Sequence, residues 1–280
     1  LVITKGFRDA LKIGYQARPR LFDLNVILPE QLYEKVLEVD ERICARGEII
    51  TPLDLTSIEE QMIKAFGSGI RSIAIVTMHG YRYPDHEKKI ATLAKEIGFS
   101  QISTSHETSP LMKLIGRGDT TVVDAYLSPI LRRYIDRVQN ELSDVPLYFM
   151  QSNGGLTNAT HFKGKDAILS GPAGGIVGAV KTATLSGYDK LICFDMGGTS
   201  TDVSHYNGAF ERTYETVLAG VSMRTPMMNI HTVAAGGGSI LHYDGNRFRV
   251  GPDSAGAEPG PCCYRNDGPL TVTDCNLLLG

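Results

Sequence analysis

The 280-residue chain carries 28 Lys and Arg against 31 Asp and Glu, which gives a net charge of −3. This balance provides no electrostatic reason to expect a nucleic acid or a membrane surface as a partner. Hydrophobic residues make up 42% and charged residues 21%, as in ordinary globular proteins of one large domain or two medium ones. No apolar run reaches the roughly 18 residues that a membrane-spanning helix needs. Leu1–Lys5 lacks the basic and apolar regions of a signal peptide.

The cysteines argue against a disulfide framework and against a zinc site. There are five of them, an odd number, and Cys262 and Cys263 are adjacent. None forms a CxxC pair, the spacing typical of structural zinc sites. We therefore predict a reducing, cytoplasmic environment.

Residues 1–105 alternate between strand-like and helix-like segments, which favours an α/β fold with a mostly parallel sheet. Asp54 or Thr56 is a suitable N-cap for the helix that follows. The β-branched run Ile70–Thr77 lies between turn-forming residues and is typical of a buried strand. The expected elements are short strands around Phe22–Leu28 and Leu37–Val39, a helix through Glu59–Phe66, a strand at Ile70–Thr77 and a helix over Pro84–Ile97 that ends at Gly98.

A composition shift near residue 105 is taken as a domain boundary, giving regions 1–105 and 106–280. Thr120–Leu142 carries a helical pattern with Pro129 inside it, which predicts a kink or break near Ser128. Asp119, just before this pattern, is expected to cap the helix. The other expected elements are a strand at Pro146–Met150, a turn at Ser152–Gly155, a helix at Ile176–Leu185, strands at Lys190–Asp195 and Thr201–Tyr206, and further strands from 210 to 280 with a glycine-rich turn at Ala235–Ser239.

The most specific motif is the segment Phe194–Ser204, FDMGGTSTDVS. A strand brings Asp195 to its carboxyl end, and two glycines then turn the chain tightly enough for backbone N–H groups to point into one concavity. Such a nest of amides, followed by hydroxyls, suits a phosphate group. The residues concerned are Gly197, Gly198, Thr199, Ser200 and Thr201.

Asp195 and Asp202 flank this turn, and carboxylate oxygens are ligands that Mg²⁺ prefers. A plain β-hairpin with a Gly-Gly turn, in which Asp195 only caps the turn, would show the same pattern. The surrounding motifs favour the phosphate-binding interpretation.

Gly171–Ile176, a helix, and then Ile192–Thr199 resemble the helix and phosphate loop of the actin, sugar kinase and heat-shock chaperone ATPase superfamily. The resemblance is closer to hydantoinase A, 5-oxoprolinase and the acetone carboxylase subunits, and it extends along nearly the whole chain. The other segments that carry it are Thr4–Asp9, Ser109–Leu111, Thr120–Leu127, Gln151–Gly155, Ser170–Gly175, Val233–Ile240, Gly251–Ala257, Pro259–Pro261 and Thr271–Asp274.

The resemblance implies a ribonuclease-H-like (actin-like ATPase) α/β fold, with mixed sheets flanked by helices and truncated at both ends. Residues 1–105 would be part of the hydantoinase/oxoprolinase N-terminal region, and residues 106–280 part of the hydantoinase A-type ATPase domain. The superfamily grips its nucleotide with two phosphate loops, and the one near the family's N-terminus is missing here. We therefore expect residues 1–280 to be inactive on their own.

The implied function is ATP-dependent hydrolysis, by ring opening, of a five-membered cyclic amide, either a hydantoin or 5-oxoproline. The protein would be a hydrolase of the N-methylhydantoinase or 5-oxoprolinase type, with ATP and Mg²⁺ as cofactors and a hydantoinase B-type second subunit as a partner. Segments 109–126 and 229–235 favour the oxoprolinase side. The alternatives are a subunit of an ATP-dependent enzyme like acetone carboxylase and a non-catalytic nucleotide-binding module.

Asp195 and Asp202 are the expected catalytic and metal-binding residues. His231 is the histidine best placed for acid–base chemistry, although a structural role is the simpler interpretation. Gly171–Gly175, at the start of a helix, could bind an anion through free N–H groups, but close packing of the helix on the sheet is the favoured expectation. The expected cofactor-binding residues are Gly197, Gly198, Thr199 and Ser200, together with Gly236, Gly237 and Gly238, whose turn would accept an adenosine ring or a phosphate or serve only as a tight turn.

Overall fold

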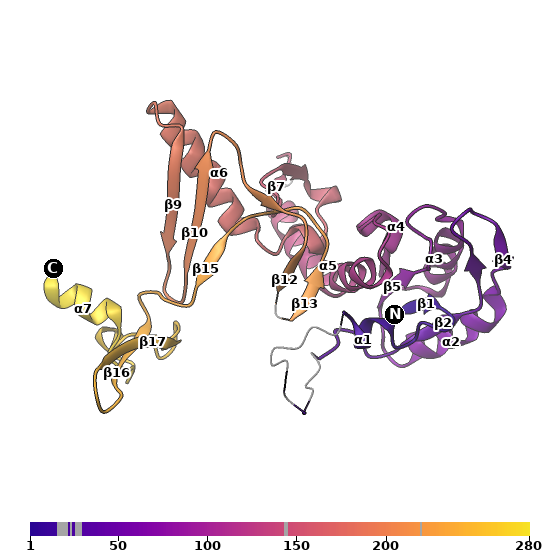
Figure 1. Ribbon diagram of the computed structural model, residues 1–280, viewed down its shortest axis with the longest axis horizontal. Helices are drawn as coiled ribbons and strands as arrows, with labels where there is room; N and C mark the ends of the chain where they lie inside the picture. The colour runs from indigo at the N-terminus through magenta and orange to yellow at the C-terminus, as the bar shows by residue number, and fades with distance from the viewer. Residues whose placement is uncertain (16–21, 23, 26–29, 143–144, 219) are drawn as a thin grey trace. The chain divides into compact units, whose positions relative to one another are not determined.

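The computed structural model describes residues 1–15, 22, 24–25, 30–142, 145–218 and 220–280 (Figure 1). It divides into two compact units. Unit 1 comprises Leu1–Gln151, Gly155–Ile168 and Thr213–Met227, and unit 2 comprises Ser152–Gly154, Leu169–Arg212 and Met228–Gly280. Most of the strand predicted around Phe22–Leu28 lies outside the described residues.

Unit 1 is built on a four-stranded sheet with the order β2-β1-β5-β6. All neighbouring strands in it run parallel, as the alternation of elements predicted. The predicted strands at Leu37–Val39 and Ile70–Thr77 are confirmed. The sheet consists of β1 (Val2–Thr4), β2 (Leu37–Val39), β5 (Ser72–Val76) and β6 (Gln101–Thr104).

Helices cover both faces of this sheet, because side chains on a strand alternate between its two faces. Val2 and Ile75 are buried against α2 (Leu55–Gly67) and α3 (Asp85–Ile97). Ile3 and Ala74 point the other way and are buried with Val122 of α5 (Leu114–Glu141). A parallel sheet buried on both faces accounts for the continuous apolar run of β5.

The ends of α2 and α3 follow the predicted signals. Asp54 is the N-cap of α2, where its Oδ1 accepts a hydrogen bond from the Thr56 amide at 3.0 Å. Helix α3 starts after Pro84 and ends at Gly98, which has a φ of 108° that favours glycine.

The start of the long helix α5 corrects the prediction. It begins at Leu114, so Asp119 lies inside the helix and does not cap it. The hydroxyls of Thr120 and Thr121 donate to the carbonyls of Gly116 and Arg117, at 2.6 Å and 2.7 Å. The predicted break near Ser128 is also absent, since α5 is continuous through Pro129. Tertiary packing outweighs the low helix propensity of the glycines beside Arg117.

Because α5 packs on β5, unit 1 continues past residue 105. The compact units thus differ from the division drawn from composition, and the boundary at 105 remains a prediction about family regions. The smaller elements of unit 1 are α1 (Ala10–Ile13), the pair β3 (Arg42–Ile43) and β4 (Ile49–Thr51), α4 (Ser105–Thr108), the hairpin β7 (Tyr148–Met150) and β8 (Leu156–Asn158), two 3₁₀ turns at Ala159–His161 and Gly164–Asp166, and the hairpin β12 (Thr216–Leu218) and β13 (Val221–Met223).

Unit 2 contains a three-stranded antiparallel sheet with the order β15-β10-β9, and α6 packs against it. The predicted strands at Lys190–Asp195 and Thr201–Tyr206 are confirmed. Its elements are α6 (Ser170–Leu185), β9 (Lys190–Met196), β10 (Thr201–Asn207), β15 (His231–Val233), the hairpin β16 (Ser239–Tyr243) and β17 (Phe248–Ser254), a 3₁₀ turn at Cys262–Tyr264 and α7 (Val272–Leu279), while β11 (Arg212–Thr213) and β14 (Met227–Met228) lie where the two units divide.

Helix α6 begins at Ser170, earlier than predicted, and includes the glycines of Gly171–Gly175. We predicted that these glycines allow close packing. A Cβ built at Gly171 or Gly175 would meet no atom within 4 Å among the described residues, so the prediction is wrong for these two positions.

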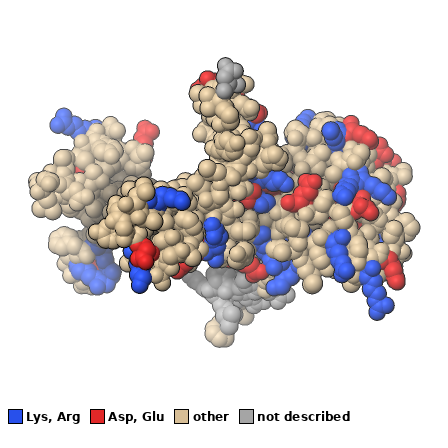
Figure 2. Space-filling view, turned by 90° about the horizontal axis from the view of Figure 1, so that it is seen from above, with Lys and Arg blue, Asp and Glu red and all other residues tan. Residues whose placement is uncertain are grey.

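Figure 2 shows basic and acidic side chains mixed on the face that it presents. In the part of the chain that the structure describes, no helix is long and apolar enough to cross a membrane.

A buried carboxylate ties α3 to the sheet of unit 1. Glu87 is fully buried, and its Oε1 accepts from the Thr77 amide at 2.8 Å and from the Ser105 hydroxyl at 2.5 Å. Its Oε2 accepts from the His106 amide at 3.0 Å. The buried Arg117 donates from Nη2 to the Thr77 carbonyl at 2.5 Å. The ends of β5 and β6 are thus held by side chains of two helices.

Replacing Glu87 by Leu should lower the free energy of unfolding by about 3 kcal/mol or more, because buried donors at Thr77 and His106 lose their acceptor. Glu96→Leu, on the exposed side of the same helix, should change it by only about 0.5 kcal/mol. Urea unfolding of the two variants measures the difference. Equal stabilities would show that the carboxylate is not needed for the fold.

Burial raises the pKa of Asp119 to about 7, well above its value of 3.8 in an unfolded chain. The folded state therefore favours the protonated acid, and its stability falls as the pH rises from about 4 to about 7. Asp119→Asn should flatten this part of the stability profile, with a gain at pH 8 of at most roughly 4 kcal/mol. Thermal unfolding across this pH range tests it. The exposed Asp136→Asn on the same helix should leave the slope unchanged.

Candidate functional site

The predicted phosphate loop joins the two strands of the hairpin β9–β10. Met196 pairs with Thr201 and Asp195 pairs with Asp202, so residues 197–200 form the connection. The Gly197 amide donates to the Ser200 carbonyl at 2.9 Å and closes the turn. Met196 to Thr199 are exposed, so the loop does not lie in a packed core.

The triple-glycine turn at Gly236–Gly238 holds this loop from one side. The Gly237 amide donates to the Gly197 carbonyl at 3.0 Å, and the Gly238 amide donates to the Gly198 carbonyl at 2.6 Å. A Cβ at Gly236 would lie 2.7 Å from the Gly197 oxygen, so no larger residue fits there without a shift. The glycines of this turn are therefore explained by the close approach of the two backbones, which leaves no room for a Cβ.

The same contact leaves two loop amides free. In a planar trans peptide, C=O and N–H point in opposite directions. When Gly237 and Gly238 bind the carbonyls of Gly197 and Gly198, the N–H groups of Gly198 and Thr199 must point away from the turn. Neither amide has an acceptor among the described residues. The loop therefore presents two adjacent donors to one side, the arrangement that a phosphate requires.

The amides of the triple-glycine turn are, by contrast, engaged. Gly236 donates to the Ser239 hydroxyl at 2.9 Å, while Gly237 and Gly238 bind the loop. The Gly237 carbonyl is engaged as well, since it accepts a hydrogen bond from the Thr273 hydroxyl. A direct cofactor contact of this turn stays a prediction, and these three amides would not supply it.

Asp195 and Asp202 face each other directly across the hairpin. Like charges in this position repel, and directly opposite Cβ atoms lie about 4.5–5.5 Å apart. Thr232 of β15 pairs with Asp202 on the other side of β10, and the Thr232 hydroxyl donates a hydrogen bond to Asp202 Oδ1 at 2.7 Å. The described residues contain no cluster of three or more His, Cys, Asp and Glu that could hold a metal. The pair fits Mg²⁺, which commonly takes one or two carboxylates and completes its shell with water and phosphate.

A groove of about 440 Å³ lies between α6 and the hairpin. Asp195 and Asp202 line it, together with Ser204 of β10. Ser204 is 8% exposed, and its hydroxyl has no hydrogen-bond partner among the described residues. Ser204 and Thr232 were not predicted from the sequence. Ser204 follows Asp202 by two positions on one strand face and Thr232 adjoins His231, but a serine or threonine on a strand has no distinctive pattern of its own.

His231, the remaining candidate from the sequence, and the acidic residue Asp274 are explained without this chemistry. His231 pairs with Val203, so it points to the sheet face opposite to Asp202 and Thr232, and an acid–base role there has no support. Asp274 is part of a capping box of α7 and accepts hydrogen bonds from the Cys263 and Thr271 amides. Although desolvation opposes it, these hydrogen bonds lower the pKa of Asp274, which explains the residue structurally.

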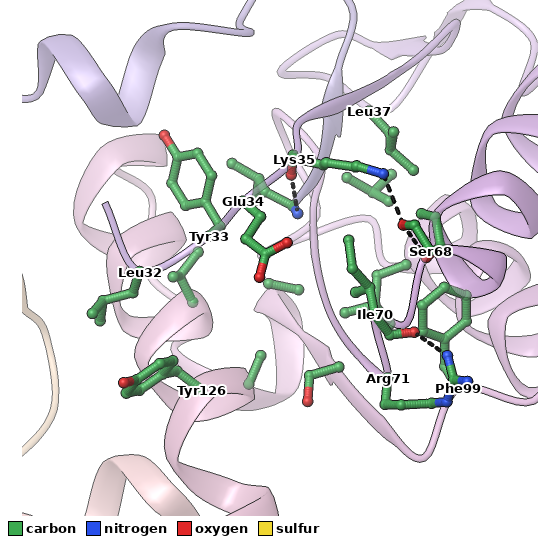
Figure 3. Close-up of a pocket in the computed structure, with 18 of the residues that line it drawn as sticks. Leu32, Tyr33, Glu34, Lys35, Leu37, Ser68, Ile70, Arg71, Phe99 and Tyr126 are labelled. Atoms are coloured by element: carbon green, nitrogen blue, oxygen red, sulfur yellow. Dashed lines mark hydrogen bonds between the residues drawn. The ribbon is translucent and has the colours of Figure 1, made fainter. Parts of the chain in front are cut away.

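Unit 1 has a hollow of its own, of about 400 Å³ (Figure 3). Tyr33, Lys35 and Tyr126 line it, and Lys35 Nζ donates to the Ser68 hydroxyl at 2.8 Å. It opens at the amino ends of β1, β2 and β5. Ligands of parallel α/β sheets bind outside the carboxyl ends of the strands, so we do not assign the function to this hollow.

Comparison with known proteins places this chain in a family. The profile described as hydantoinase/oxoprolinase matches residues 117–280, and that of the hydantoinase/oxoprolinase N-terminal region matches residues 1–98. The chain is 44% identical to the 5-oxoprolinase of Saccharomyces cerevisiae and 46% identical to 5-oxoprolinase 1 of Arabidopsis thaliana. Each match covers 100% of this chain and 24% of the relative, so the chain spans about a quarter of their length.

Solved structures support the same assignment. The crystal structure of ATP-dependent caprolactamase from Pseudomonas jessenii matches with a TM-score of 0.80 at 31% identity, covering 100% of this chain and 42% of that one. The nucleotide-free structure of acetone carboxylase matches with a TM-score of 0.75 at 23% identity over 100% and 43% of the two chains, which shows a shared fold. The predicted α/β fold of the actin-like ATPase type, with mixed sheets and flanking helices, is confirmed. With a family profile that covers more than half of its residues, the chain belongs to the hydantoinase/oxoprolinase family.

Proposed function

We propose that this chain contributes the phosphate-binding side of an enzyme that uses ATP to open a five-membered cyclic amide. The observation that carries the proposal is the exposed loop beside the carboxylates Asp195 and Asp202, in which the Gly198 and Thr199 amides have no acceptor among the described residues. Amide donors and a Mg²⁺-binding carboxylate pair are what phosphoryl transfer needs, because it depends mainly on positioning and charge neutralisation.

Each residue has a distinct task in this proposal. The amides of Gly198 and Thr199 hold phosphate oxygens, and Thr199 and Ser200 also carry hydroxyls that can donate to them. Asp195 and Asp202 hold Mg²⁺, and Thr232 keeps the Asp202 carboxylate oriented. ATP would transfer its terminal phosphoryl group to the amide oxygen of the ring and leave as ADP. One water molecule then adds to the activated carbon and the C–N bond, which otherwise resists hydrolysis, breaks. A second water molecule releases phosphate, so that the opened chain ends in a carboxylate.

The proposed substrate is 5-oxoproline rather than a hydantoin. Relatives from Saccharomyces cerevisiae, Arabidopsis thaliana and Dictyostelium discoideum, 43–46% identical to this chain, are named 5-oxoprolinases. The caprolactamase alpha subunit of Pseudomonas jessenii, 33% identical, is by its name part of a larger assembly. We therefore propose a second, hydantoinase B-type subunit as partner, and a cytoplasmic location consistent with five free thiols.

The test uses the complete polypeptide that contains residues 1–280, purified with its partner if one co-purifies. ATP hydrolysis should depend on 5-oxoproline and release glutamate in a fixed ratio to ADP. ATP use that responds to acetone and bicarbonate and never to a cyclic amide would replace this function with a carboxylase. ATP binding without turnover under any of these conditions would indicate a non-catalytic module.

Asp195→Asn in the complete polypeptide should lower kcat for ATP hydrolysis by about 100-fold or more, because a metal-binding carboxylate is lost where charge develops. The melting temperature should stay the same or rise slightly, since Asp195 is exposed and repels Asp202. Asp189→Asn, an exposed change just before β9, is the matched control. Full activity of Asp195→Asn would show that the loop serves only as a hairpin turn.

Gly236→Ala should raise the KM for MgATP by about 10-fold or more, because its Cβ would push the Gly197 and Gly198 backbone out of place. Such overpacking costs about 1–3 kcal/mol. Gly171→Ala is the control, since its Cβ would meet no atom within 4 Å among the described residues. Nucleotide titrations of both variants measure the effect. An unchanged KM in Gly236→Ala would mean that the turn does not set the loop.

A further inference from the structure

We propose that the groove between α6 and the hairpin β9–β10 binds the ring of the cyclic amide, and that Ser204 donates a hydrogen bond to it. The identity of the ring rests on the proposed function, whereas the site itself rests on the groove. Ser204 would be a substrate-binding residue that neither the motifs nor the family comparison identifies.

The groove lies next to the residues proposed to hold the metal. The carboxylates of Asp195 and Asp202 both line the groove. Ser204 lies two residues further along β10 on the same face, and a strand rises about 3.3 Å per residue. Ser204 is thus roughly 7 Å along the strand from the carboxylate pair Asp195 and Asp202. A small ring bound against Ser204 would place its amide oxygen next to the metal and the terminal phosphate, where it must react.

The Ser204 side chain is buried. Buried polar groups almost always have hydrogen-bond partners, and an exception requires an explanation. Ser204 is 92% buried, as its exposure of 8% shows, and its hydroxyl has no partner among the described residues. A ligand with one hydrogen-bonding edge and otherwise apolar faces would satisfy it.

One wall of the groove is apolar. Helix α6 contributes Pro172, Ile176, Ala179 and Ala183, at helical spacing along one side. At Gly175, which also lines the groove, an added Cβ would meet no atom within 4 Å among the described residues. Small residues therefore leave open space along an apolar wall. A compact ring with methylene groups fits this chemistry, and any carboxylate on it must point to the open side, since the described residues that line the groove include no Lys or Arg.

A nucleotide base is the competing occupant, and the position disfavours it. The base lies at the opposite end of ATP from the terminal phosphate. The groove begins at the two carboxylates proposed to hold that phosphate's metal, so the reacting partner, and not the base, belongs there.

The binding test uses Cys193, which lines the groove and pairs with Ser204 across the hairpin. In the complete polypeptide, without ATP, 5-oxoproline should slow alkylation of Cys193 by iodoacetamide several-fold, as measured by peptide mass spectrometry. The exposed Cys262 and Cys275 lie outside the groove, and their rates should stay unchanged. Protection by adenosine and none by 5-oxoproline would overturn the proposal.

The kinetic test uses Ser204→Ala. The KM for 5-oxoproline should rise about 5- to 10-fold, the effect expected for one lost hydrogen bond. The KM for MgATP should not change, and Ser204→Thr, which keeps the hydroxyl, should restore part of the loss. Ser186→Ala, at the exposed end of α6, is the control. Ala179→Leu should narrow the groove and weaken ring binding without unfolding, because Ala179 is exposed.

The two proposals fail in different ways. Ring opening that proceeds while Cys193 stays unprotected and Ser204→Ala keeps a normal KM would overturn the ring site and leave the proposed function intact. If no cyclic amide stimulates ATP use, the proposed function fails. Protection of Cys193 by 5-oxoproline or hydantoin, in the absence of ATP, then still decides whether the groove binds such rings.

Discussion

The structure of the candidate site depends on one backbone contact, in which the amides of Gly237 and Gly238 bind the carbonyls of Gly197 and Gly198. Because a trans peptide directs its N–H away from its C=O, these two hydrogen bonds also orient the amides of Gly198 and Thr199. The contact requires glycine in the turn at 236–238, since a Cβ at Gly236 or Gly238 would lie under 3 Å from the loop backbone. The loop conformation proposed to bind phosphate is therefore fixed by a segment distant in sequence.

The hairpin register adds the acidic half of the site. Asp195 and Asp202 are opposite each other because Met196 pairs with Thr201 beside the loop. A shift of the register by one residue would send one of them to the other face of the sheet. The resulting pair of like charges is unfavourable alone, and a divalent cation bound between the carboxylates would relieve the repulsion. The loop and the carboxylate pair are thus consequences of a single turn.

Local signals predicted most of the elements, and long-range contacts explain the failures. The Asp54 cap, the apolar run of β5 and the Gly-Gly turn each act within a few residues, so they could be read from sequence. The start of α5 could not be predicted from the sequence, because the glycines beside Arg117 are helical as a result of packing in unit 1. The supporting role of Gly236–Gly238 likewise depends on a contact with residues far away along the chain. Ser204 was missed because a serine on a strand has no distinctive pattern, and only the structure shows that its hydroxyl has no hydrogen-bond partner among the described residues.

The glycines of α6 acquire a different meaning from the one that the sequence suggested. Glycine in a helix costs about 1 kcal/mol relative to alanine, so its presence there needs a compensating gain. Close packing is not the gain, since Gly171 and Gly175 face open space among the described residues. Gly175 and Ala179 instead line a groove that larger side chains would fill, next to the carboxylates that would hold the metal. A helix that gives up stability to keep space beside reactive groups is what a substrate site requires, and this is the physical reason to place the ring there.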